Sequence, residues 1–116
     1  MDLASLVYGL GQSMPKAELY GMTSQMQRAA ASVPANIAEG YQRGTRKEYA
    51  RFIAIARGSV AEVETFLLLA VRVGHLTYAK VQPSLQAAGE VGRMLTRLKQ
   101  RLDEAPLRST PPVPNP

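Results

Sequence analysis

The feature that most constrains the fold is a pair of apolar-periodic segments, between residues 20 and 76, that meet at a tight turn. Within each segment the apolar side chains recur every three or four residues, the spacing that places them on one face of an α-helix. Gly40 and Gly44 bracket the polar turn between the segments, and glycines at such positions end helices and allow sharp reversals. The sequence therefore predicts a helical hairpin at the centre of the chain.

Local signals predict where the two hairpin helices begin and end. The first helix is expected to start near residue 20 and to end with Gly40 as its C-terminal cap. Pro34 lies inside its apolar pattern, and a proline there should kink the helix or begin a new one, because it has no N–H to donate. Thr45, followed three residues later by Glu48, has the pattern of a capping box. We therefore expect the second helix to start after Thr45 and to end at Gly74.

Two more segments with helical periodicity flank the hairpin. The first spans residues 2–14 and is ended by Pro15, and the last spans residues 77–104, with Thr77 as its expected cap. Five of the twelve residues from 105 to 116 are prolines, which preclude a packed helix and predict a flexible tail. Four helices with short links and no strand pattern predict an all-α, antiparallel up-down-up-down four-helix bundle over residues 1–104 and a proline-rich tail over residues 105–116.

The first helix of this bundle is short beside the third. A long helix paired with a short one leaves apolar surface that no helix of the same chain covers. Other copies of the same chain can bury this apolar surface, so the protein is expected to form a homo-oligomer.

The residue types that most catalytic centres need are absent or isolated. The chain has no cysteine and a single histidine, His75, so one chain assembles neither a catalytic triad nor a zinc site. Glu62 and Glu64 lie about 200° apart around a helix, too far to act as an acid–base pair. We therefore expect no enzyme activity, no metal and no cofactor. The lack of cysteine, of a signal segment and of a membrane-spanning apolar run favours a cytoplasmic protein without a membrane partner.

Basic residues dominate the charge pattern, with 14 Lys and Arg against 9 Asp and Glu and a formal net charge of +5. One group surrounds the turn and the start of the third helix: Arg43, Arg46, Lys47, Arg51 and Arg57. A second group recurs every four residues in the last helix: Arg93, Arg97 and Arg101. An antiparallel bundle brings both groups to one end, where they would form a basic rim that binds nucleic-acid phosphates. The alternative is a solvated surface with intrahelical pairs, such as Arg93 with Glu90.

A polar face runs along the second helix. Its members, spaced by four, four and three residues, are Arg28, Ser32, Asn36 and Glu39. These side chains either contact a partner or form hydrogen bonds with polar residues of the third helix, such as Ser59 and Glu62, within one subunit or between subunits. We favour the structural network, because buried charged groups persist in proteins only when they are paired.

Several runs of residues resemble a known family. They are Thr23-Ser24-Gln25-Met26-Gln27-Arg28-Ala29-Ala30, Val33-Pro34-Ala35-Asn36-Ile37-Ala38-Glu39-Gly40, Arg46-Lys47-Glu48-Tyr49-Ala50-Arg51-Phe52, Ala56-Arg57-Gly58-Ser59-Val60-Ala61-Glu62-Val63-Glu64-Thr65 and Gly92-Arg93-Met94-Leu95. These runs are similar to those of the small bacterial four-helix-bundle proteins encoded in intervening sequences of 23S ribosomal RNA genes. The resemblance implies a homopentameric ring of bundles and no enzyme, with ribosomal RNA binding as the usual suggestion for the family's role.

A role of a different class stays open beside RNA binding. The chain is then a protein–protein adaptor or scaffold, such as a retroelement accessory protein, and its partner is another protein. The similarity that suggests this role is one of fold only.

Overall fold

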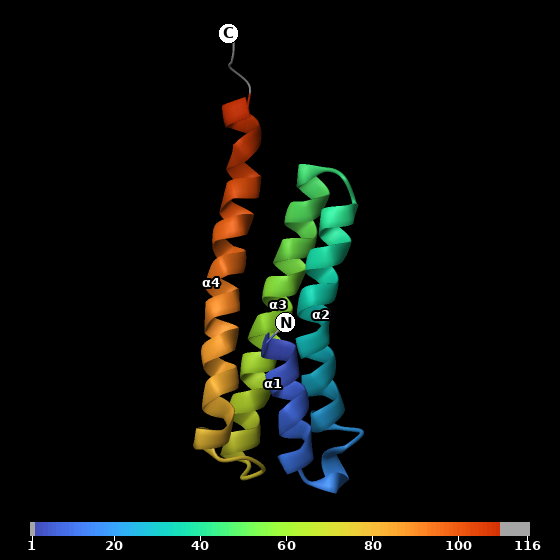
Figure 1. The fold of residues 1–116 in the computed structure, drawn as a ribbon, viewed down its shortest axis with the longest axis vertical. Helices are drawn as coiled ribbons and strands as arrows, with labels where there is room; N and C mark the ends of the chain where they lie inside the picture. The colour runs from blue at the N-terminus through green and yellow to red at the C-terminus, as the bar shows by residue number, and fades with distance from the viewer. Residues whose placement is uncertain (1, 110–116) are drawn as a thin grey trace.

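Four α-helices form the fold of the chain, which a computed structural model describes over residues 2–109, with side chains described for residues 3–104. They are α1 (Asp2–Leu10), α2 (Met22–Gln42), α3 (Arg46–Arg72) and α4 (Tyr78–Ser109), and two short 3₁₀ turns, Gly11–Ser13 and Lys16–Glu18, link the first two. Successive helices run in opposite directions (Figure 1), and no strand occurs between residues 2 and 109. The predicted all-α fold with four helices is confirmed.

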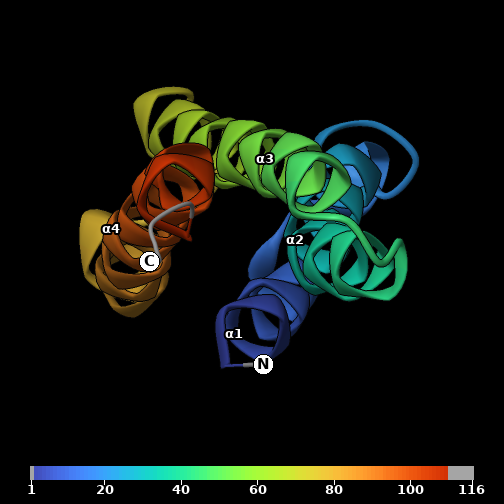
Figure 2. The same ribbon diagram turned by 90° about the horizontal axis from the view of Figure 1, so that it is seen from above.

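The helix α3 lies between α2 and α4, and α1 fills part of the remaining corner (Figures 1 and 2). Because α1 has only nine residues, against 27 in α3, it lies alongside only one end of its neighbours (Figure 1). At the other end the bundle has three helices, and apolar side chains such as Tyr41 and Met94 remain 74% and 48% exposed.

The core is built from small and medium-sized apolar side chains of all four helices. The fully buried ones include Leu3 and Val7 of α1, Met26, Ala30 and Val33 of α2, Ile53, Ala56, Val63, Leu67 and Ala70 of α3, and Val81, Ala88 and Leu95 of α4. Burying each Val, Leu, Ile or Met side chain contributes roughly 1.5–3 kcal/mol relative to leaving it in water. The buried alanines add little area, but they let the helices approach closely, so α3 packs tightly on both α2 and α4.

The turn between α2 and α3 differs from its prediction at Gly40. Gly40 is not a C-terminal cap: it is buried inside α2, which continues to Gln42. The absence of a side chain leaves room for Phe52, whose Cβ lies 2.6 Å from where a Cβ of Gly40 would be. Gly44, with a φ of 84°, takes the left-handed conformation in the turn.

Predicted N-terminal caps are present at both Thr45 and Thr77. The backbone N–H of Glu48 donates to Thr45 Oγ1 (3.2 Å), and that of Lys80 donates to Thr77 Oγ1 (3.2 Å). Only this half of the expected capping box at Thr45 is formed, because the carboxylate of Glu48 accepts instead from Arg51. α3 ends at Arg72, and Gly74, with a φ of 85°, follows it in the turn.

Proline affects the helices less than expected. α2 is one helix from Met22 to Gln42 with Pro34 inside it, so no new helix begins there. In the turn where Pro34 has no N–H, the Ser32 hydroxyl donates to the Ala29 carbonyl and the Asn36 amide donates to the Ser32 carbonyl, both at 2.8 Å. α4 continues to Ser109, five residues beyond its predicted end, whereas α1 ends at Leu10 rather than near residue 14. The remainder of the predicted tail, residues 110–116, lies outside the described residues.

Gly40 offers a direct test of the packing between α2 and α3. Gly40→Ala is expected to lower the free energy of unfolding by about 1–3 kcal/mol, the usual cost of overpacking a core. Gly58→Ala is the matched control, because no atom lies within 4 Å of the Cβ it would add. This control should raise the free energy of unfolding by about 0.5–1 kcal/mol through helix propensity alone. Urea unfolding followed by circular dichroism measures both, and equal effects would contradict the buried position of Gly40.

Glu18 joins the link before α2 to the turn after α3. Its carboxylate accepts from the Met22 N–H (3.1 Å) and lies 3.0 Å from Nε2 of His75. The bond from Met22, followed by the bond to His75, lowers the pKa of Glu18 below its ordinary value of 4.5. A lowered folded-state pKa stabilises the folded protein above the unfolded-state value, and this contribution is lost as the pH falls through the folded-state pKa.

Glu18→Gln is therefore expected to destabilise the protein at pH 7 and to have a smaller effect near pH 3. The glutamine keeps an oxygen for Met22 but loses the charge that favours both contacts. Urea unfolding of both proteins between pH 7 and pH 3 measures the difference. If the two stability curves run parallel over this range, the carboxylate of Glu18 does not provide this pH-dependent contribution.

Candidate nucleic-acid interface

A groove between α3 and α4 contains two hollows, one following the other along the helices. On α3, Ala50 lines the first hollow, and Arg57 and Glu64, seven and fourteen residues later, line the second. Residues seven apart share one face of a helix, so both hollows open on the same side of α3. We call them the end hollow, beside the turn between α2 and α3, and the middle hollow, halfway along the bundle.

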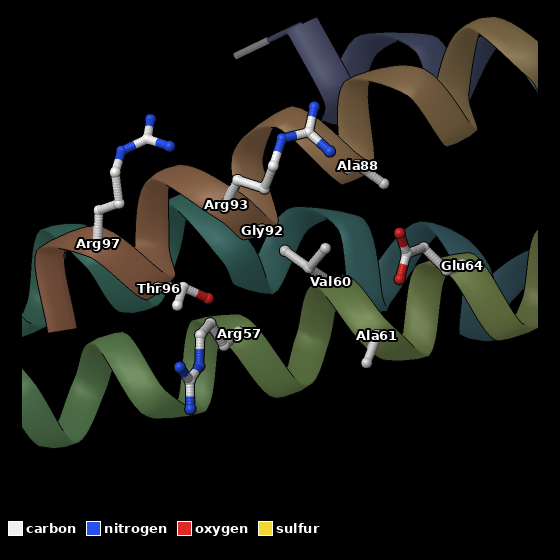
Figure 3. A pocket seen from close by; sticks show the side chains of 10 residues that line it. Arg57, Val60, Ala61, Glu64, Ala88, Gly92, Arg93, Thr96 and Arg97 are labelled. Atoms are coloured by element: carbon white, nitrogen blue, oxygen red, sulfur yellow. The ribbon is translucent and has the colours of Figure 1, made fainter. Parts of the chain in front are cut away.

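The middle hollow has a volume of about 550 Å³ (Figure 3). Its lining comes from Arg57, Val60, Ala61 and Glu64 of α3 and from Ala88, Gly89, Gly92, Arg93, Thr96 and Arg97 of α4. The floor is recessed because small residues form it, and a Cβ on Gly92 would already touch Val60 at 3.6 Å. Figure 3 shows Arg93 and Arg97 extending from α4 and Arg57 extending from α3 on the opposite side of the groove.

The charges of the middle hollow are largely uncompensated. All three guanidinium groups are exposed, and among the described side chains Arg57, Arg93 and Arg97 form no hydrogen bond or ion pair. The pair of Arg93 with Glu90, considered from the sequence, is not formed within this part of the chain. Glu64 is the one acidic residue in the described lining. Like charges around a hollow create a positive potential that favours an anion.

The end hollow has a similar volume, about 540 Å³, and is lined by Arg46, Lys47, Glu48, Ala50, Arg51, Lys99, Leu102 and Asp103. Half of its basic residues are neutralised: Arg51 pairs with Glu48 (3.2 Å) and Lys99 with Asp103 (2.6 Å). The hydrogen bond from Arg51 lowers the pKa of Glu48 below its ordinary value. Arg46 and Lys47 have no such partner within residues 3–104.

The groove gathers six of the eight basic residues predicted to bind nucleic acid: Arg46, Lys47, Arg51, Arg57, Arg93 and Arg97. They form a band along α3 and α4, whereas the sequence predicted a rim at one end. Arg43 lines neither hollow. It pairs with Glu39 at 2.9 Å, and its guanidinium stands over the Phe52 ring. Arg101 lines neither hollow, because each step of four residues overshoots a full helical turn by about 40°.

Some lining residues were missed by the sequence analysis. Lys99 stands next to the row of arginines but was not assigned a role, and neither were the small residues Ala88, Gly89 and Gly92. Their spacing along α4 is the signal that was available, because residues three or four apart share one helix face. The sequence did not show that Val60 of α3 lies against Gly92.

The predicted polar network between α2 and α3 reduces to one contact within the chain. The Ser32 and Ser59 hydroxyls are hydrogen-bonded at 2.6 Å; because Ser32 gives its single proton to the Ala29 carbonyl, Ser59 is the donor, and Asn36 bonds within its own helix. Arg28 and Glu62 are exposed instead, and Glu39 pairs with Arg43. The two serines are small enough to meet between closely packed helices, whereas a guanidinium or carboxylate there would lose its hydration. A network between subunits stays a prediction.

Between residues 2 and 109, no three His, Cys, Asp or Glu side chains come close enough together to hold a metal ion. None of the helices in that range combines the length and apolar character of a membrane span.

Similarity to known proteins agrees with this fold. The chain matches no curated protein sequence. The structure is similar to the crystal structure of a protein of unknown function from the S23 ribosomal protein family of Bacteroides thetaiotaomicron. The TM-score is 0.78 at 22% sequence identity, over 84% of this chain and 92% of the other. The family model for the 23S rRNA-intervening sequence protein matches residues 1–97. The chain therefore belongs to the family of 23S rRNA-intervening sequence proteins.

Proposed function

We propose that the protein is a non-enzymatic homopentamer that binds structured RNA, with the groove between α3 and α4 supplying the phosphate contacts. The observation that carries this proposal is the gathering of six basic side chains along one groove, three of them unpaired around the middle hollow. Phosphate groups are the natural partners of such guanidinium groups, which bind them through two parallel hydrogen bonds. The name of the structural neighbour's family, which refers to a ribosomal protein, agrees with an RNA partner.

Assembly would multiply a modest charge. One chain carries +5, and five copies at +5 each carry +25. Five grooves on one particle would engage a folded RNA at several points, and linked contacts bind far more tightly than single ones. The exposed apolar side chains of the bundle are available for contacts between subunits. Besides Tyr41 and Met94 they include Ile55, Leu68, Leu69 and Val73.

Neutralising the middle hollow tests the assignment of the groove. The triple variant Arg57→Gln/Arg93→Gln/Arg97→Gln is expected to bind a ribosomal RNA fragment about 10–100-fold more weakly than wild type at near-physiological salt. Each groove that the RNA engages loses three phosphate contacts, which should also make the slope of log affinity against log salt shallower by about 2–3 for each engaged groove. Fluorescence anisotropy across a salt series measures both quantities.

The matched control is Lys16→Gln/Arg28→Gln/Arg72→Gln, which removes the same charge from exposed residues outside both hollows. We expect this control to lose less than threefold in affinity, through the general field alone. If the two triple variants weaken binding equally, net charge rather than the groove carries the affinity. If wild type binds no RNA even at low salt, the proposed function is wrong.

The proposed oligomer is tested by mass. Light scattering coupled to size exclusion should give five times the chain mass of 12.6 kDa, unchanged between low and high salt, because burial of apolar surface is not screened. A mass equal to one chain at tens of micromolar would contradict the pentamer.

A protein adaptor is the second candidate, favoured by the exposed apolar side chains of α3. Ile55, Glu62 and Leu69 are seven residues apart and share one edge of the helix, with Ile55 and Leu69 41% and 40% exposed. A pulldown after nuclease treatment that returns one specific protein, lost on Ile55→Glu/Leu69→Glu, would support this function over RNA binding.

A further inference from the structure

We propose that the middle hollow binds unpaired nucleotides of an RNA strand, so that the protein prefers single-stranded segments over duplex. This inference rests on the proposed function, because it names the part of the RNA that the groove takes. It comes from the shape of the hollow and the composition of its floor, features that phosphate attraction alone does not require.

Backbone attraction explains the arginines but leaves the floor unexplained. Basic side chains on a flat or convex surface are sufficient to bind the phosphates of a duplex. Here the arginines stand at the two edges of a depression whose floor is Val60, Ala88 and Gly92, with the exposed Ala61 beside Arg57 on the α3 edge. Larger side chains at Ala61 or Gly92 would fill this depression without changing its charge. A ligand that contacts the whole site therefore carries negative charge where it meets the arginines. Between these charges it has a flat and largely apolar part.

A nucleotide of a single RNA strand has this character. Its base presents a π-face to an apolar surface, and its phosphates lie on either side. Proteins bind single strands in such charged grooves, and arginine planes also stack on unpaired bases. Arg93 and Arg97 are four residues apart on α4, so their Cβ atoms are about 5–6 Å from each other. The two side chains therefore form a row able to follow a sugar–phosphate chain.

The geometry of a duplex keeps its bases away from the recessed surface between the arginines. In an A-form duplex the bases are stacked inside, and the phosphates and 2′-hydroxyls form the outer surface. A duplex therefore reaches the arginine edges but not the recessed Ala88 and Gly92. An unpaired base reaches both.

Glu64 sets the direction in which the strand extends. It lies seven residues from Arg57, about 10 Å along α3, and its carboxylate repels phosphate. The strand is therefore expected to run from the middle hollow towards the end hollow, where Arg46 and Lys47 are also unpaired.

The test adds an apolar side chain to the lining of the middle hollow without changing the charge of the hollow. Ala61→Leu adds an apolar side chain at an exposed position that lines the hollow, and Ala38→Leu makes the same change at an exposed position of α2 outside it. The probes are a fluorescein-labelled 12-nucleotide oligouridylate and a labelled RNA hairpin with a 12-base-pair stem, each titrated at several salt concentrations. Thermal unfolding of both variants verifies that they fold like wild type.

We expect Ala61→Leu to weaken binding of the oligouridylate about tenfold, while hairpin binding changes less than twofold and the salt slope for both probes is retained. Ala38→Leu should change neither affinity. Gly92→Ala, whose added methyl group fits against Val60, should give a smaller loss in the same direction.

Other outcomes separate this inference from the proposed function. If wild type binds both probes and Ala61→Leu leaves the oligouridylate affinity unchanged, or weakens both probes equally, the groove binds backbone only and the inference is wrong, while RNA binding stands. If wild type binds neither probe nor the ribosomal RNA fragment at low salt, the proposed function fails and the inference fails with it.

Discussion

The packing of α3 against both α2 and α4 is the interaction on which the rest of the structure depends. Its buried face alternates small and larger side chains, such as Ala56, Val60, Val63 and Ala70. Small residues opposite them, Ala30 of α2 and Ala88 of α4, bring the helix axes close. The same packing creates the groove. Gly92 of α4 lies against Val60 of α3. Because Gly92 has no side chain, the two helices approach closely there, and the surface between them is recessed.

Charge is distributed over this scaffold in two different ways. Near the turn between α2 and α3, two basic side chains are paired with acidic neighbours of the same helix, Arg43 with Glu39 and Arg51 with Glu48, whereas Arg46 and Lys47 have no such partner within residues 3–104. Such exposed pairs add little stability, but they lower the local positive potential. Around the middle hollow the arginines lack such partners. Since mutual repulsion of like charges disfavours this arrangement, a bound anion would relieve it, which is why the middle hollow rather than the end of the bundle is the stronger candidate site.

Sequence periodicity predicted the helices and their N-terminal caps, because these depend on residues close together in the chain. The caps at Thr45 and Thr77 need only a hydroxyl and a backbone N–H three residues later. Gly40 was misassigned because its role depends on Phe52, which approaches it from the next helix. The continuous helix through Pro34 likewise depends on its surroundings, which override the local preference of proline.

The candidate site was predictable in part for the same reason. The basic residues are visible in the sequence, but a row such as Arg93, Arg97 and Arg101 drifts around the helix, and only the packing shows which members face the groove. The recessed floor combines Val60 of α3 with Gly92 of α4, a pairing that no local pattern reveals. Charged members of the expected network, Arg28 and Glu62, remain in solvent because the contact between α2 and α3 is close enough only for Ser32 and Ser59.

A titration of the isotope-labelled protein with oligouridylate, followed by amide NMR spectra at low salt, tests the central claim most directly, because each amide reports on its own surroundings. We predict that the largest shifts fall on residues of the middle hollow, Ala61, Gly92 and Thr96, and that the exposed face of α2 around Arg28 and Ala35 changes little. Shifts concentrated on that face of α2, or no shifts at all at saturating RNA, would contradict the assignment of the groove between α3 and α4 as the RNA-binding surface.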